Sequence, residues 1–545
     1  MGLRDRETVL KSCGLEAPKS LAKTHIVKKH LLIVLLFLAG SAMSQQVEPV
    51  RYEVDRWGKD QGCGFQSWDA QGGIMVSETG KTSHDKRRLW RFACIDTSLF
   101  EQRSDLIPLP DKLKFAASGC DDRFSAFLFV NDGNRKASDS LDFMVVSFDK
   151  QEGKYQTFWD KWPEQSVPLS VEVVDGTMMM AVNNKSGNGF VYFYELSEQT
   201  FRTVKPSLSE SFVLFQTAAF KQRHGFVVAA KEYEDKRFVS TAFLVFSASG
   251  NLMGTYRYGN ITNAALGRMV FRFDDDGHLV VIGTLERESG RKVNLEGVTE
   301  NFDKESVGVV WIRFVGGQPE SKTYLFKDMP QIEHALTASD RVRVREERLK
   351  KKEKAEAALS EVAFQFLTPR LADFGDLTVF AAEAFLPYYH TETRMSYGYY
   401  GYYGGYPYTY TVFDGYDFFS EILLAFDRDG QLQWQQSVKF DNALTYDLFP
   451  HAAEGVCHDE LVVASPCRNT LRYTAFDARG QALMQLQEEK LPAIHGGDYV
   501  DEEYFAEMRR WYGNRFLIYG SQVIQNSTQP KPRRWVNYIQ RVQYE

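Results

Sequence analysis

Short apolar strands recur along the chain, and each opens on a turn-like residue pair. The early copies start about 50 residues apart. A fixed period of this length, filled with short strands, is typical of the blades of a β-propeller. The eight stretches are residues 72–77, 123–130, 175–181, 224–230, 276–283, 376–382, 459–464 and 513–519.

A second pattern follows many of these strands. Residues 245–252, 425–432 and 475–482 each contain Phe, a four-residue turn and Gly. Asp or Ser opens such a turn, and Gly takes the left-handed position that closes a hairpin. The pattern predicts sheets of hairpin-connected strands. One such sheet cannot bury both of its faces, whereas a ring of stacked sheets can.

The sequence therefore predicts an all-β fold, a seven- or eight-bladed β-propeller over residues 45–545. We expect the apolar strand at 535–544 to pair with the strand at 50–54 and close the ring. The 27 Tyr and 40 Phe residues agree with this fold, because aromatic residues favour strands. The alternative fold is two packed β-sandwich domains.

Two segments interrupt the period, and the first is residues 331–367. Its centre, residues 341–359, is rich in Lys, Arg, Glu and Ala and is helix-forming, which predicts one charged helical insertion. One interpretation is a solvated surface helix. The other is a basic docking arm for an acidic partner or for membrane headgroups.

The second interruption is the Tyr/Gly-rich segment 387–419. Gly between aromatic residues prevents a regular helix, so we expect a loop or a long flexible hairpin. Tyrosine offers a flat apolar ring and a hydroxyl, which suits the binding of glycans or proteins. The alternative is a loop that packs on its own propeller, or a disordered low-complexity tract. The candidate ligand-binding residues are Tyr397, Tyr399, Tyr400, Tyr402, Tyr403, Tyr406, Tyr408 and Tyr410.

The motif Phe413-Asp-Gly-Tyr416 is followed by Ala425-Phe-Asp-x-x-Gly-x-Leu432 and Trp434. With the Tyr/Gly-rich segment and the Lys-rich helix before it, this combination resembles a group of uncharacterised exported, propeller-like proteins of Bacteroidetes-type bacteria. The resemblance covers residues 330–440. It implies a location in the envelope or outside the cell, and it brings no catalytic residues.

The N-terminus has the pattern of a signal peptide. Lys28, Lys29 and His30 precede an apolar stretch at 31–40, and small residues at 41–44 follow. This order predicts a leader over residues 1–44 and cleavage after Ser44. The apolar stretch is shorter than the ~20 residues that span a bilayer, so we expect no transmembrane span after cleavage. The predicted location is the periplasm, the cell surface or the medium; the alternative is a buried helix of a cytosolic protein.

The net charge bears on the class of binding partner, and the cysteine positions bear on which disulfides can form. Residues 45–545 hold 58 basic and 69 acidic residues, a net charge of −11, which argues against nucleic acid as a partner. Five cysteines follow the leader. A strand between Cys457 and Cys467 would separate them by roughly 33 Å, whereas a disulfide needs about 7 Å between Cα atoms, which argues against this pair.

No motif of established catalytic chemistry is present, so we name no catalytic residue and expect no cofactor or metal. Asp274-Asp-Asp-Gly277 and Asp427-Arg-Asp-Gly430 resemble fragments of calcium loops, but each lacks the later bidentate Glu, and we interpret both as hairpin turns. The favoured function is a non-enzymatic binding or scaffold propeller that contacts an envelope protein or glycan. The alternative is a hydrolase or lyase of glycans or peptides, since fold does not decide function. Two carboxylates converging on the central channel would favour that alternative.

Overall fold

The computed structural model consists largely of β-strands in its described part, which confirms the all-β fold class. The predicted leader, 1–44, lies outside that part. The structure describes residues 51–56, 61–131, 143–162, 166–184, 188–259, 264–287, 305–337, 364–367, 369–396, 406–467, 469–484, 486–491 and 494–544.

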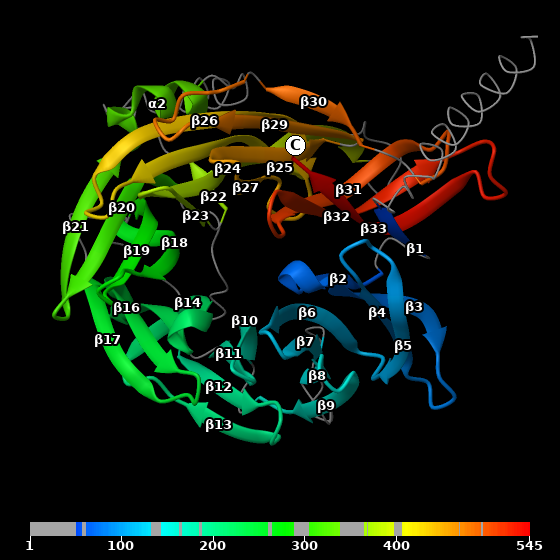
Figure 1. Cartoon of the computed structure of the whole chain (residues 1–545), viewed down its shortest axis with the longest axis horizontal. Helices are drawn as coiled ribbons and strands as arrows, with labels where there is room; N and C mark the ends of the chain where they lie inside the picture. Colours follow the sequence, from blue (N-terminus) through cyan, green and yellow to red (C-terminus); the bar gives the residue numbers. More distant parts are fainter. Residues whose placement is uncertain are drawn as a thin grey trace, which may run out of the picture. The chain divides into compact units, whose positions relative to one another are not determined.

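The strands form eight antiparallel sheets that follow one another around a ring (Figure 1). The sheets are the blades of a β-propeller, so the propeller interpretation is confirmed with eight blades and the sandwich alternative is wrong. Blades one to four consist of β2 (Cys63–Ser67), β3 (Gly73–Thr82), β4 (Arg88–Ile95) and β5 (Glu101–Leu109); β6 (Leu113–Cys120), β7 (Phe124–Asn131), β8 (Phe143–Asp149) and β9 (Lys154–Asp160); β10 (Ser166–Val174), β11 (Thr177–Asn184), β12 (Gly189–Glu195) and β13 (Thr200–Val204); and β14 (Ser211–Phe220), β15 (Gly225–Glu234), β16 (Arg237–Ser247) and β17 (Leu252–Gly259).

The second half of the ring has the same plan, except that the inner strand of blade six is divided in two. Blades five to eight consist of β18 (Ala264–Phe273), β19 (Leu279–Arg287), β20 (Ser306–Val315) and β21 (Gln318–Leu325); β22 (Gln365–Phe366), β23 (Arg370–Phe374), β24 (Leu377–Ser396), β25 (Tyr406–Phe426) and β26 (Leu432–Thr445); β27 (Ala453–Cys457), β28 (Glu460–Cys467), β29 (Thr470–Phe476) and β30 (Gln487–Lys490); and β31 (Tyr499–Arg510), β32 (Arg515–Gln525) and β33 (Arg533–Gln543) with β1 (Arg51–Asp55).

The eighth blade joins the two ends of the ring. Its order is β1-β33-β32-β31, and the register runs from Arg51↔Gln540 to Asp55↔Val536. The predicted pairing of the last strand with the first is therefore confirmed. The recurring strand starts occupy the same position in every blade: each of the eight predicted stretches supplies the second strand of a blade.

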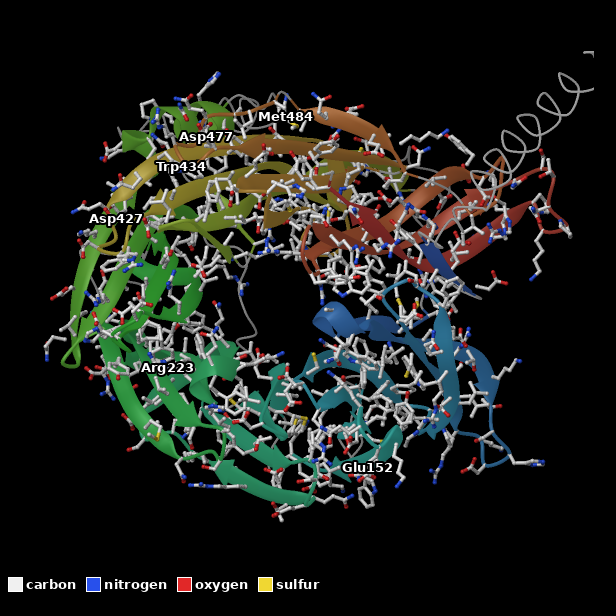
Figure 2. All side chains as sticks on the ribbon, viewed as in Figure 1. Glu152, Arg223, Asp427, Trp434, Asp477 and Met484 are labelled. Atoms are coloured by element: carbon white, nitrogen blue, oxygen red, sulfur yellow. The ribbon has the colours of Figure 1, made fainter. Side chains whose placement is uncertain are left out.

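The Phe–turn–Gly pattern joins blades four, six and seven to the blade before each of them. Gly480 has a φ of +74°, which L residues rarely adopt, and a Cβ on it would lie 2.6 Å from the ring of Trp434. Trp434 also donates its indole N–H to the carbonyl of Ala478, at 3.1 Å. Gly250 lies against Phe193 in the same way. Figure 2 labels Trp434 and Asp477, which opens the turn of blade seven.

Substituting Gly480→Ala is expected to destabilise the ring more than Gly316→Ala. Both glycines have positive φ, 74° and 57°, so each substitution carries a backbone cost of about 1 kcal/mol. Only Gly480 also faces a ring; nothing lies within 4 Å of a Cβ on Gly316. Overpacking against Trp434 adds about 1–3 kcal/mol. Urea denaturation of the two variants measures the difference, and equal losses would contradict the packing role of Gly480.

Within the described residues, three short 3-10 helices and one α-helix lie between strands: η1 (Asp69–Gln71), η2 (Lys221–Arg223), η3 (Phe326–Asp328) and α2 (Pro330–Thr337). The helix α2 begins the predicted insertion 331–367, whose helix-forming centre lies outside the described residues; β22 ends it. No helix in the described ranges combines the length and the apolar character that a membrane-spanning helix requires.

Cys457 and Cys467 lie at opposite ends of a hairpin. Cys457 pairs in register with Glu460, and Cys467 is the last residue of β28, seven residues beyond Glu460. Seven residues of extended strand span about 24 Å, well beyond the reach of a disulfide. The sequence argument against this disulfide is confirmed.

Candidate functional site

Blade six carries the longest hairpin in the described ring. Its strands β24 and β25 have 20 and 21 residues, whereas the second strand of blade three has 8. Their antiparallel register extends to Ser396↔Tyr406, with bulges at 384/385 and 388/389. We call residues 387–396 and 406–416 the aromatic hairpin. The Tyr/Gly-rich segment 387–419 is therefore paired strand on both sides of residues 397–405.

The predicted tyrosines fall into two groups. Tyr397, Tyr399, Tyr400, Tyr402 and Tyr403 lie outside the described residues, between the ends of β24 and β25.

Tyr406, Tyr408 and Tyr410 belong to β25. The ring of Tyr410 is half-buried, its hydroxyl donates to Glu392, and the guanidinium of Arg394 lies 5.1 Å from the ring centroid. This tyrosine is thus engaged within the hairpin.

Aromatic rings continue along one side of the hairpin from its base to its exposed part. Phe418 lies 5.3 Å from Phe385, which lies 5.5 Å from Tyr416. Tyr416 lies 5.0 Å from Phe413, which lies 5.4 Å from Tyr389. These five residues form what we call the aromatic face. Phe385 and Phe418 are buried, while Phe413 and Tyr389 are 37% and 50% exposed.

The same hairpin also carries polar groups. The Nδ1 atom of His390 is 2.6 Å from Oδ1 of Asp414, and its Nε2 is 3.3 Å from Oε1 of Glu392. The hydrogen bond to Asp414, followed by that to Glu392, raises the pKa of His390 above its ordinary value. The hairpin therefore carries exposed rings as well as hydrogen-bonding and charged side chains. This combination suits sugar rings and polypeptides.

A second feature of blade six is a buried ionic group at the junction with blade seven. The guanidinium of Arg370 donates from Nη1 to Glu383, at 2.9 Å, and from Nη2 to Glu421 and Glu454, both at 2.6 Å. Its Nε also bonds Glu454, at 3.0 and 3.1 Å. The backbone N–H groups of His451 and Ala452 donate to Glu383. We call Arg370, Glu383, Glu421, Glu454 and His451 the Arg370 cluster.

The three carboxyl groups of this cluster ionise differently. Burial, followed by the adjacent charge of Glu454, raises the pKa of Glu421 well above its ordinary value. Burial would also raise the pKa of Glu454, but the charge of Arg370 outweighs it and lowers that pKa to about 2. The same charge lowers the pKa of Glu383 against the effect of burial. The pKa of Glu421 therefore lies above those of Glu383 and Glu454.

The cluster bears on the hydrolase or lyase alternative. General acid–base catalysis needs side chains within hydrogen-bonding reach of the substrate. The side chains of Glu383, Glu421 and Glu454 are 0%, 0% and 4% exposed, and only Arg370, at 25%, meets solvent. These carboxyl groups therefore do not present an acid–base pair to a ligand.

The calcium-like fragment at 274–277 is a hairpin turn between β18 and β19. Asp274 accepts the backbone N–H of His278, at 2.7 Å. Asp274, Asp276 and His278 come close enough together to hold a metal ion, but the guanidinium of Arg313 lies among them. Arg313 donates to Asp274 at 2.6 Å and to Asp276 at 2.8 Å. The positive charge at this turn is thus supplied by the chain itself.

Asp427, labelled in Figure 2, opens the turn between β25 and β26 in blade six. Its Oδ1 accepts the backbone N–H groups of Asp429 and Gln431 at 3.0 and 2.8 Å. The carboxylate thus stabilises the turn, in agreement with the interpretation of this fragment as a hairpin turn.

No family model and no curated protein matches this chain. Among solved structures, it is similar to dihydro-heme d1 dehydrogenase NirN in complex with DHE, at 12% identity and a TM-score of 0.41, over 91% of this chain and 80% of that one. It is similar to the β-propeller domain of the Trilobed protease from Pyrococcus furiosus, at 6% identity and a TM-score of 0.32, over 78% and 93%. It is also similar to the periplasmic gluconolactonase PpgL of Pseudomonas aeruginosa, at 11% identity and a TM-score of 0.35, over 81% and 96%. Likenesses this distant do not bear on the chemistry of the site.

Proposed function

We propose that the protein is an exported propeller of the cell envelope that binds a glycan or a protein through the aromatic hairpin. The observation that carries this proposal is the aromatic face, whose rings at Tyr389 and Phe413 stand half in solvent on a hairpin longer than its blade needs. Large apolar rings that remain exposed on a soluble surface are typical of recognition sites.

Three further features support the proposal. The segment breaks the blade period, and a scaffold commonly carries its binding groups on such additions. Five more tyrosines stand between the two strands of the hairpin, at 397, 399, 400, 402 and 403. The pattern at 28–44 is that of a signal peptide, which supports export to the periplasm, the cell surface or the medium.

Replacing Tyr389 and Phe413 by Ser, or Tyr399, Tyr400, Tyr402 and Tyr403 by Ser, is expected to reduce binding at least tenfold. Loss of aromatic anchors has this effect because such anchors dominate interface energy, typically by more than about 1.4 kcal/mol. Stability should change by only about 0.5 kcal/mol per exposed residue. Pull-down from envelope extract and a melting curve on the same variants provide the two measurements.

A matched control is Trp159→Ser. Trp159 is 57% exposed on β9 of blade two, so this variant loses an exposed ring of similar size away from the hairpin. Its binding should equal that of the unmodified chain. Protease treatment of the extract removes a protein partner, and periodate oxidation removes a glycan, so the two ligand classes are distinguished. Unchanged binding by both hairpin variants would show that the hairpin is a spacer.

A further inference from the structure

The Arg370 cluster contains more carboxyl groups than its positive charge can balance. Glu383 and Glu421 are direct partners in the β24–β25 register, so two acidic side chains stand opposite each other on one face of the sheet. Like charges in this arrangement repel. Glu454 of β27 adds a third carboxyl group, and among the described residues Arg370 provides the one guanidinium paired with the three. Burial makes such an imbalance costly.

Hydrogen bonding shows where the imbalance lies. Glu383 receives donors from Arg370, His451 and Ala452, and both oxygens of Glu454 receive the Nε–H of Arg370. Glu421 receives one donor at Oε1, while its buried Oε2 has none. The carboxyl groups of Glu421 and Glu454 are within hydrogen-bonding reach of each other. Two ionised carboxylates cannot bond, because both only accept; a proton on one of them makes the bond possible.

We propose that Glu421 and Glu454 hold one proton between them at neutral pH, and that this proton joins blade six to blade seven. The ionisable groups that face it are Arg370 and Glu383 from blade six and His451 from the segment that enters blade seven. The raised pKa of Glu421 agrees with this arrangement. The inference does not depend on what the aromatic hairpin binds.

The cluster lies directly under the aromatic face. Glu383 fixes the backbone of His451 and Ala452, the two residues before β27. The ring of His451 lies 4.1 Å from the ring of Phe418, and it is buried with neither nitrogen hydrogen-bonded. Its Nδ1 points toward Glu383, at 3.5 Å from Oε2. Loss of the shared proton therefore places a third negative charge beneath the base of the hairpin.

The sign of the pH effect follows from Glu421. A carboxyl group whose pKa is raised by folding contributes stability that is complete below its ordinary pKa and is lost as pH rises through the raised value. The junction should thus weaken on the alkaline side. Glu454, whose pKa is about 2, acts in the opposite direction and only in strong acid.

The test is Glu421→Gln, which keeps the shape of the side chain and its ability to donate while removing the titration. Near the ordinary pKa of glutamate, at about pH 4, the variant should melt close to the unmodified chain, and it should melt at an increasingly higher temperature than the unmodified chain as pH rises through neutral to alkaline values. The matched control is Glu232→Gln. Glu232 is a buried carboxylate paired with a single arginine, Arg257, at 3.0 Å. Burial would raise its pKa, but the hydrogen bonds from Ser240 and Arg257 outweigh burial and lower it. That control should lose stability already at neutral pH.

Infrared spectroscopy gives a direct readout. The difference spectrum of the unmodified chain minus Glu421→Gln at neutral pH should contain the C=O band of a protonated carboxylic acid. Glu172, whose burial raises its pKa to about 7, is present in both chains, so its band cancels in this difference. The inference is overturned if the Glu421 difference spectrum lacks the band, or if Glu421→Gln destabilises at neutral pH as much as Glu232→Gln does.

Discussion

A chain that ends at residue 534 is expected to lose the cooperative fold of the ring and to aggregate. The deletion of 535–545 removes most of β33, which pairs with β1 on one side and β32 on the other. Val536, Tyr538 and Ile539 are 0% exposed. Tyr538 belongs to the apolar cluster shared with blade seven, and Ile539 to the cluster shared with blade one. Each costs about 2–5 kcal/mol when truncated, against a total stability of about 5–15 kcal/mol.

Size-exclusion chromatography and thermal melting measure this effect. The edge of β32 becomes exposed in the truncated chain, and exposed edges pair with other chains. Deleting β1 alone provides the graded control, because β33 then keeps β32 as a partner and the ring loses only an outer strand. That chain should remain monomeric with a lower melting temperature. A truncated chain that elutes and melts like the complete one would contradict closure through β33.

Arg370→Met is expected to be the most damaging single substitution in blade six, with a loss of about 3–5 kcal/mol. Methionine fills the space of the arginine stem but leaves three carboxyl groups at 0%, 0% and 4% exposure without a counter-charge. Removing one partner of a buried ionic group is costly because the other remains desolvated. Urea denaturation at neutral pH measures the loss.

Arg87→Met is the control for this substitution. Arg87 pairs with Asp85 at 2.8 Å, with side chains 53% and 58% exposed, so the loss should be about 0–1 kcal/mol. Adding Glu454→Gln to Arg370→Met should restore part of the stability, since it removes an ionised carboxylate that Arg370 no longer balances. If Arg370→Met and Arg87→Met lose the same free energy of unfolding, the Arg370 cluster does not hold blades six and seven together.

The architecture was accessible from sequence because its determinants are local and repeated. The eight strand starts, such as 276–283, combine a turn with an apolar run, and each became the second strand of a blade. The glycine of the Phe–turn–Gly pattern was predicted as a turn residue. That the same glycine also contacts an aromatic residue of the preceding blade, as Gly480 contacts Trp434, depends on the ring and could not be predicted from one repeat.

The Arg370 cluster escaped prediction for a different reason. Arg370 and Glu454 are 84 residues apart in sequence and meet only because consecutive blades stack. A weak signal existed, since buried glutamates follow the apolar run in the second strands of blades one, four, five and six, at Glu78, Glu232, Glu286 and Glu383. A lone Glu after an apolar run is also what a solvent-facing strand end looks like, so the pattern alone does not identify a buried ion.

Because β1 pairs with β33, the ring can close only near the end of protein synthesis. Arg51 and Gln540, which are partners in the ladder, are 489 residues apart in sequence. At about 5–20 residues per second, roughly 25–100 s of synthesis separate the two strands. During that time β1 has no strand to pair with, although seven other blades can already have formed. A polypeptide that stalls or is cut before residue 533 retains two open sheet edges, so incomplete products differ from finished ones in a way that proteases and chaperones recognise.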